Sequence, residues 1–200
     1  MYTRKRGKTM KVAKGEAGYI RTRKRKILLK TVLEFGIVVA LLILGIIETG
    51  TRQNLLTVVA VLGCLPASKA LVELIMVLPH HSITQERAAE IELNANLLTR
   101  AYDMVFTSEK IIMPVEAIVI SGNTICGYSS NKKVDMNVIA SHLKQYLHAN
   151  RFDKVSVKIF DNYTAFATRA EGMNNIAAIE KNDSSRHEKG IRQILLNISL

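Results

Sequence analysis

Two long apolar runs separated by a short polar link constrain this chain more than any other feature. The first run is Ile27–Ile47 and the second is Leu55–Leu78, with only the residues from Glu48 to Asn54 between them. As a helix at about 1.5 Å per residue, the first run reaches about 30 Å, the thickness of a bilayer's hydrocarbon core. The link is polar and contains Gly50, so we expect the two runs to form an antiparallel membrane hairpin.

Two other interpretations of the runs are weighed against membrane spans. A cleaved signal peptide has a shorter apolar core and is followed by a small-residue cleavage site, whereas here a second apolar run follows. The runs could also be buried helices of a soluble protein, because Lys30, Glu34, Lys69 and Glu73 interrupt their hydropathy. The length of both runs favours membrane spans over either alternative.

Positive charge is concentrated at the start of the chain. Residues 1–30 hold twelve Lys or Arg residues and only one acidic residue, Glu16, whereas the link between the runs holds only Arg52. The positive-inside bias places such a segment in the cytoplasm, and an even number of spans returns the chain to that side. We therefore expect a cell-membrane protein with cytoplasmic N- and C-termini. Its parts are a basic tail (1–26), a transmembrane hairpin (27–78, with spans 27–47 and 55–78) and a cytoplasmic domain (82–200).

The basic tail has two clusters that can contact anionic groups. Lys and Arg beside a membrane helix bind anionic lipid head groups, at about 1 kcal/mol per side chain near the surface. The same side chains can bind the phosphate backbone of a nucleic acid without sequence preference, so nucleic-acid binding remains an additional hypothesis. The residues predicted to make these lipid or phosphate contacts are Arg4, Lys5, Arg6, Arg21, Arg23, Lys24, Arg25 and Lys26.

The four charges inside the apolar runs form two pairs at helical spacing. Lys30 and Glu34 are four residues apart on the first run, and Lys69 and Glu73 are four apart on the second, so each pair shares a helix face. Glu34 and Lys69 lie at similar depth from the cytoplasmic ends, which predicts an ion pair across the hairpin. Charges at membrane depth are costly unless they are paired or hydrated. The predicted network either fixes the register of the hairpin, forms a contact surface for another membrane protein, or contributes to an ion pathway in an oligomer.

The region after Pro79 has the pattern of an α+β domain with a mostly antiparallel sheet. The expected order is α-β-β-α-β-β-α. The predicted elements are a helix over Ile83–Phe106, strands Ile111–Ile120 and Thr124–Ser130 around a turn at Ser121–Asn123, a helix capped by Asp135, strands Lys154–Phe160 and Tyr163–Arg169, and a final helix from the capping box Ser185–Glu188.

Residues 86–170 resemble the restriction-endonuclease-like core, including the nuclease-related domains of some membrane-anchored proteins, by the order of their elements. The resemblance implies an acidic residue on the first strand of the hairpin and a Glu-x-Lys triplet on the second, which together bind Mg²⁺ for phosphodiester cleavage. Glu116 occupies the first strand, but the second reads TICGYSS and has neither residue of the triplet. The resemblance therefore implies a domain whose catalytic site is lost, or a divergent metal-dependent nuclease.

No catalytic motif is present elsewhere in the sequence. There is no phosphate-binding G-x-x-x-x-G-K, no G-x-G-x-x-G and no G-x-S-x-G nucleophile elbow. We expect no catalytic residues, no metal site and no cofactor. The expected function is a two-pass membrane protein whose non-catalytic cytoplasmic domain serves protein interaction, scaffolding or regulation. The expected partner is another protein, either a membrane protein or a second copy of this chain.

Overall fold

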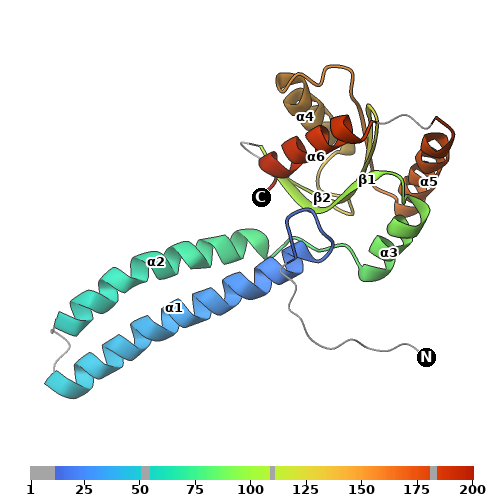
Figure 1. The fold of residues 1–200 in the computed structure, drawn as a ribbon. Coiled ribbons are helices and arrows are strands. Elements are labelled where there is room, and N and C mark those ends of the chain that lie inside the picture. Colours follow the sequence, from blue (N-terminus) through green and yellow to red (C-terminus); the bar gives the residue numbers. More distant parts are fainter. Residues whose placement is uncertain (1–11, 51–54, 109–110, 181–183) are drawn as a thin grey trace, which may run out of the picture. The chain divides into compact units, whose positions relative to one another are not determined.

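The computed structural model describes residues 12–50, 55–108, 111–180 and 184–200 (Figure 1). The contacts within the chain divide it into two compact units. One unit is Ile20–His80, and the other combines the described residues up to Tyr19 with His81–Leu200.

The first unit consists of two long apolar helices, α1 (Tyr19–Thr49) and α2 (Leu55–Val77). Both are long enough and apolar enough to cross a membrane. Helix α1 begins at Tyr19, before the apolar run, because no Gly or Pro interrupts residues 19–35. The second basic cluster, which the sequence assigned to the tail, is therefore the first part of this helix.

Helices α1 and α2 pack along a narrow seam with heptad spacing. The buried residues recur at intervals of three, four or seven, which is the pattern of a two-stranded coiled coil. They are Ile20, Ile27, Thr31 and Val38 on α1, and Ala60, Ala67, Ala70 and Val77 on α2. The α2 side of the seam is built of small residues, and a Cβ placed on Gly63 would lie 3.2 Å from Cγ2 of Val38. Small residues on α2 therefore leave room for α1 side chains such as that of Val38.

The second unit is an α+β domain around a mixed sheet of four strands. Its elements in chain order are α3 (Gln85–Asn94), β1 (Thr99–Thr107), β2 (Ile112–Ser121), β3 (Thr124–Tyr128), α4 (Met136–Ala149), β4 (Ser156–Phe160), α5 (Tyr163–Glu180) and α6 (Ser185–Ile198). The strand order is β1-β2-β3-β4. The β1–β2 and β2–β3 pairings are antiparallel. The β3–β4 pairing is parallel, because α4 returns the chain to the sheet edge at which β3 begins.

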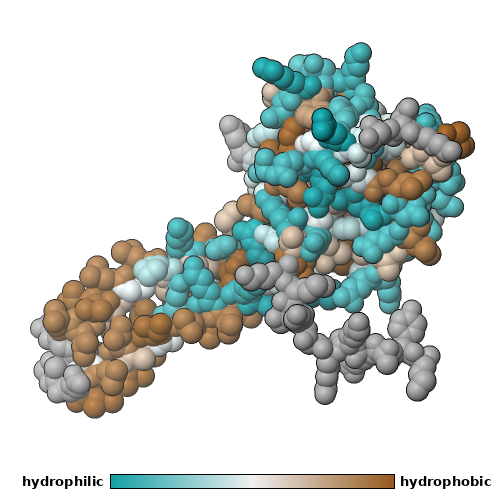
Figure 2. Space-filling view, viewed as in Figure 1, coloured by the Kyte–Doolittle hydropathy of each residue, from teal (hydrophilic) through white to brown (hydrophobic). Residues whose placement is uncertain are grey.

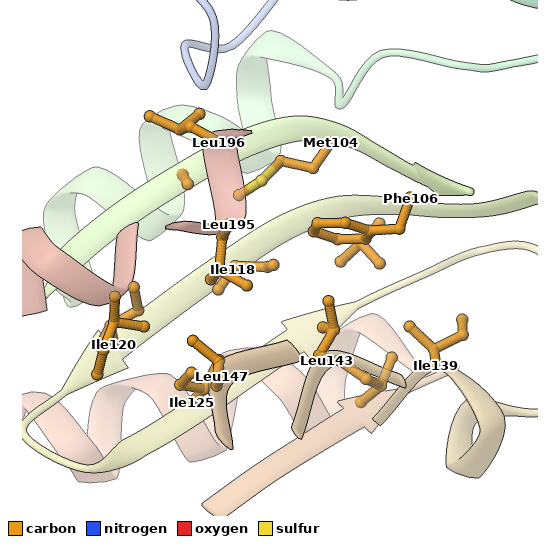
Figure 3. Packing of buried hydrophobic residues seen from close by; sticks show 14 of the residues in the cluster. Met104, Phe106, Ile118, Ile120, Ile125, Ile139, Leu143, Leu147, Leu195 and Leu196 are labelled. Atoms are coloured by element: carbon orange, nitrogen blue, oxygen red, sulfur yellow. The ribbon is translucent and has the colours of Figure 1, made fainter. Parts of the chain in front are cut away.

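Helices cover both faces of this sheet, which gives a three-layer arrangement (Figure 1). Helices α4 and α6 cover one face, and their Leu143, Leu147 and Leu195 pack on Ile118 and Ile120 of the central strand β2 (Figure 3). Helices α3 and α5 cover the other face, where Ile91 and Phe166 are buried with Val119. Strand β2 is apolar almost throughout because both of its faces are covered.

The alternation of side chains shifts by one residue at Asp103 in β1 and at Glu116 in β2. Ala101 and Met104 face the same core, although they are three residues apart, and so do Val115 and Ile118. Asp103 has a φ of 54°, in the left-handed region that is unusual for a residue other than glycine. Residues Tyr102 and Met104 on either side of it pair with Ala117 and Val115. Both strands thus change phase together, each at a buried acidic residue.

Several sequence predictions for the α+β unit are confirmed. The strand pair Ile112–Ser121 and Thr124–Tyr128 turns at Gly122, which has a φ of 54°. Asp135 caps α4, since its side chain accepts the amide hydrogen of Asn137 at 2.9 Å. The final helix, α6, is also confirmed and spans Ser185–Ile198, although its N-cap is Ser184 and not Ser185, the first residue of the predicted capping box.

The predicted helix over Ile83–Phe106 is wrong in its second half. Helix α3 ends at Asn94, and Thr99–Thr107 forms strand β1 instead. The apolar residues of this segment fit a helical period, but its Thr, Tyr, Val and Phe residues favour strands. Strand β1 is buried on both faces, so it lacks the polar–apolar alternation by which strands are recognised.

The predicted strand Tyr163–Arg169 is also wrong, because α5 begins at Tyr163. Asp161–Asn162 was interpreted as a hairpin turn, whereas the side chain of Asn162 accepts the amide hydrogen of Thr164 at 2.8 Å, as a residue does at a helix start. The buried residues Phe166, Ala170 and Met173 then follow at helical spacing. The observed order is therefore α-β-β-β-α-β-α-α.

Candidate functional site: the charged helical hairpin

Two ion pairs stabilise the charged half of the α1–α2 hairpin. Arg23 Nη2 lies 3.4 Å from Glu73 Oε1, which joins the start of α1 to the end of α2. Lys30 Nζ lies 3.7 Å from Glu34 Oε1, within α1 and at the i, i+4 spacing that the sequence predicted. Three of the four charges predicted to form an intramembrane network are thus paired, but Glu73 is paired with Arg23, a residue predicted to contact lipid.

The predicted ion pair between Glu34 and Lys69 does not form. The contact between Val38 and Gly63 sets the register of the hairpin and places Glu34 opposite Ala67 on the seam. Lys69 is two residues beyond Ala67, which at about 100° per residue is a rotation of about 200° around α2. Similar depth in the two helices is therefore not sufficient for an ion pair between Glu34 and Lys69, because Lys69 lies on the outward face of α2.

Lys69 is exposed and has no acidic residue within ion-pair distance in the described part of the chain. Its neighbours on the outward face are large apolar side chains that are themselves exposed, including Leu62, Leu65 and Val72. Glu34 differs, because one of its oxygens is paired with Lys30 while Oε2 is buried without a hydrogen-bond partner. Lys69 is therefore the one member of the predicted network that the structure leaves without a counter-charge among the described residues.

The second basic cluster has two kinds of side chain. Arg23 and Lys24 bridge to α2, since Arg23 pairs with Glu73 and Lys24 Nζ donates to the carbonyl oxygen of Leu78. A cation is favourable at this position, where the carbonyl groups at the end of a helix carry partial negative charge. Arg21, Arg25 and Lys26 are exposed. The other predicted contact residues, Arg4, Lys5 and Arg6, lie outside the described residues.

In the α+β unit, the buried carboxylate of Asp103 joins the two segments that flank the hairpin in sequence. Its Oδ2 accepts hydrogen bonds from the amide of Gly18, at 2.9 Å, and from the hydroxyl of Ser82. Its Oδ1 accepts the amide hydrogen of Ile83 at 2.9 Å. The sequence analysis missed this residue because it placed Asp103 in a helix. A lone acid within the apolar stretch Leu98–Phe106 was the available signal, since buried carboxylates need several donors.

Glu116, the acidic residue on which the nuclease resemblance depends, lies in β2 and is 9% exposed. Its carboxylate accepts a hydrogen bond from the Ser130 hydroxyl. Strand β3 contributes no second carboxylate and no lysine beside it, and the described residues contain no group of three His, Cys, Asp or Glu that could hold a metal ion. These residues do not fit a Mg²⁺-dependent cleavage site.

An open groove lies between β4 and α5. It has a volume of about 890 Å³, and its basic lining residues are Lys158 and Arg169. Arg169 and Lys158 lie near the thiol of Cys126, whose pKa is raised by burial despite these two cations. A thiol with a raised pKa stays protonated near neutral pH and is a poor nucleophile. The groove can therefore contact anionic groups, but it holds no evident reactive side chain. The sequence does not predict this groove, because its pattern indicates a strand over Tyr163–Arg169, the first two turns of α5.

Comparison with known proteins adds no relative to this description. No protein-family model, no curated protein and no solved structure matches the chain.

Proposed function

We propose that this chain is a two-pass membrane protein whose helical hairpin holds a non-catalytic α+β unit at the cytoplasmic face, where the unit binds a protein partner. The exposure of the hairpin's apolar side chains carries this proposal. Only 17% of the most apolar stretch of either helix is buried within the chain, so neither resembles the core helix of a soluble protein. Figure 2 displays apolar side chains along both helices. A surface of this size is stable in contact with lipid and unfavourable in water.

The distribution of charge supports an orientation with both termini in the cytoplasm. The basic cluster Arg21–Lys26 lies at the start of α1, and Arg23 and Lys24 link it to the end of α2. Positive charge is therefore concentrated at the open end of the hairpin, where α1 begins and α2 ends. Cytoplasmic loops carry this excess of Lys and Arg, and anionic lipids of the inner leaflet attract it.

The α+β unit supports a binding role better than a catalytic one. Two of its buried acids, Asp103 and Glu188, each accept several hydrogen bonds from the chain and are structural. The groove between β4 and α5, with Lys158 and Arg169 in its lining, is a surface for a partner with anionic groups. Nucleic acid is a second candidate partner, because Arg21, Arg25 and Lys26 are exposed along one segment of α1.

The topology can be tested with two matched cysteine variants of the full-length protein in cells. Thr51→Cys lies between the helices in sequence, and Ser185→Cys lies at the start of α6. We expect a membrane-impermeant thiol reagent to label Thr51→Cys in intact cells, and Ser185→Cys only after permeabilisation. The unsubstituted chain, with Cys64 and Cys126, is the control for background labelling.

A membrane wash at alkaline pH completes the test. The protein should remain in the pellet after this wash and dissolve only with detergent. Recovery in the supernatant, or labelling of Ser185→Cys in intact cells, would contradict the proposal. Binding to nucleic acid that is stronger than binding to anionic vesicles at the same salt concentration would favour the second candidate partner.

A further inference from the structure

We infer that the outward face of α2 around Lys69 binds a transmembrane helix of another protein, and that this helix carries an Asp or Glu at the same depth. The inference rests on the proposed membrane location of the hairpin. It adds the chemistry of the partner, which the topology alone does not specify.

The first observation is that Lys69 lacks a counter-charge on a face that is otherwise apolar. Leu62, Leu65, Val72 and Met76 surround it along the helix and are 61%, 71%, 56% and 43% exposed. All the acidic residues of the described hairpin near its depth are engaged elsewhere, Glu34 by Lys30 and Glu73 by Arg23. An ammonium group in hydrocarbon is strongly unfavourable unless it reaches the interface or meets an opposite charge.

The second observation is that the direction of α2 hinders Lys69 from reaching the interface. Its nearest helix end is the C-terminal one, at Val77, about 12 Å away at helical rise. The Cα–Cβ bonds of a helix tilt towards its N-terminus, so the side chain of Lys69 starts in the opposite direction, deeper into the bilayer. Lys30 has the favourable geometry instead, because the N-terminus of α1 is its nearest helix end. Lys69 is therefore better satisfied by a carboxylate within the membrane than by head groups.

The third observation separates a different protein from a second copy of this chain. A two-fold dimer formed through this face would bring two Lys69 side chains together, and like charges at low dielectric repel. Of the two acids near this depth, Glu34 is on the seam with α1 and points away from this face, and Glu73 is paired with Arg23. Charge complementarity thus favours a helix that supplies a carboxylate and no cation at this depth.

The test uses the full-length protein in phosphatidylcholine vesicles, with a synthetic leucine-rich transmembrane helix as the probe. Three probes differ at one position about 12 Å from one end, which holds Glu, Gln or Leu. Association is measured by energy transfer between labelled protein and labelled probe. We expect the Glu probe to bind about tenfold more tightly than the Leu probe, the size of a polar contact between helices in lipid.

Variants of the protein then identify Lys69 as the source of this preference. Lys69→Leu should remove the preference, and Lys69→Arg should keep it because the charge remains. Ser68→Leu is the matched control, since Ser68 is polar and exposed but lies about 100° away around α2. It should leave the preference unchanged.

Each outcome is informative. Equal binding of the three probes, or a preference that survives Lys69→Leu, would overturn the inference. Self-association of the protein that depends on Lys69 would assign the face to a second copy instead and would also overturn it. A protein that washes off the vesicles at alkaline pH contradicts the proposed function itself. A protein that stays in the vesicles and does not distinguish the probes contradicts only the inference about Lys69.

Discussion

At the scale of single residues, the buried polar groups differ in how well they are satisfied. Asp103 accepts hydrogen bonds from Gly18, Ser82 and Ile83. Tyr102, the residue before it, is 5% exposed, and its hydroxyl has no hydrogen-bond partner among the described residues. Replacing Asp103 should therefore destabilise the protein, whereas removing the hydroxyl of Tyr102 should not.

Replacing Asp103 with Ala should destabilise the α+β unit by about 3 kcal/mol, because two amides and a hydroxyl lose a charged acceptor in a buried place. Amide hydrogen exchange of the full-length protein in micelles should speed up at Gly18 and Ile83. The control is Asp153→Ala, since Asp153 is exposed and pairs with His148 at 3.3 Å. That change should cost less than about 1 kcal/mol. Unchanged exchange at Gly18 and Ile83 in Asp103→Ala would show that the carboxylate does not hold these segments.

Replacing Tyr102 with Phe should leave the protein as stable as before or stabilise it by about 1 kcal/mol, because the lost hydroxyl has no partner. Burial raises the pKa of Tyr102 from the ordinary 10 to about 12. The unfolded chain therefore loses this proton first, and the contribution of neutral Tyr102 to stability is lost between pH 10 and pH 12. As the pH rises across this range, the unfolding free energy of Tyr102→Phe should fall less steeply than that of the unsubstituted protein. A clear loss of stability at pH 7 would indicate a hydrogen bond to the hydroxyl.

At the scale of elements, the small residues of α2 decide how closely the two long helices pack. The seam residues Ala60, Gly63, Ala67 and Ala70 leave room for side chains of α1, such as that of Val38. Gly36 on α1 is another small residue that could allow close approach of the two helices. A Cβ on Gly36, however, would meet nothing within 4 Å, so this glycine lies outside the seam.

These two glycines form a matched test of the seam. Gly63→Leu should destabilise the hairpin by about 2 kcal/mol, because its side chain would overlap Val38. Gly36→Leu should have little effect on packing, since its side chain would point away from α2. Unfolding of the full-length protein by SDS in mild micelles, followed by circular dichroism, compares the two. Equal destabilisation by both substitutions would contradict the seam described above.

The elements of the α+β unit differ in how readily their sequences predict them. Strands β2 and β3 and helix α4 follow from a turn at Gly122 and a cap at Asp135, both of which are local signals. Strand β1 and helix α5 do not, because local patterns fit either state at those positions. Burial of β1 on both faces and packing of Phe166 against the sheet select the observed states.

At the scale of the whole molecule, the chain combines one apolar unit and one unit with a polar surface. The hairpin exposes most of its large apolar side chains, whereas those of the α+β unit are gathered into two cores on either side of the sheet. The excess positive charge belongs to the start of the chain, as the sequence analysis found. This division is the basis of the proposed membrane location, and it follows from the sequence and structure of this chain.

Sequence alone determined the two long helices, the clustering of positive charge and the α+β class of the remaining chain. These features depend on the length of apolar runs and on net charge, which are properties of composition along the chain. Only the tertiary structure decided that Glu73 pairs with Arg23, that Lys69 faces outward and that Asp103 joins the segments flanking the hairpin. Such contacts depend on rotation about a helix axis and on strand phase. A shift of one residue changes the rotation about the helix axis and the strand phase. The contacts are therefore fixed by packing between segments distant in sequence.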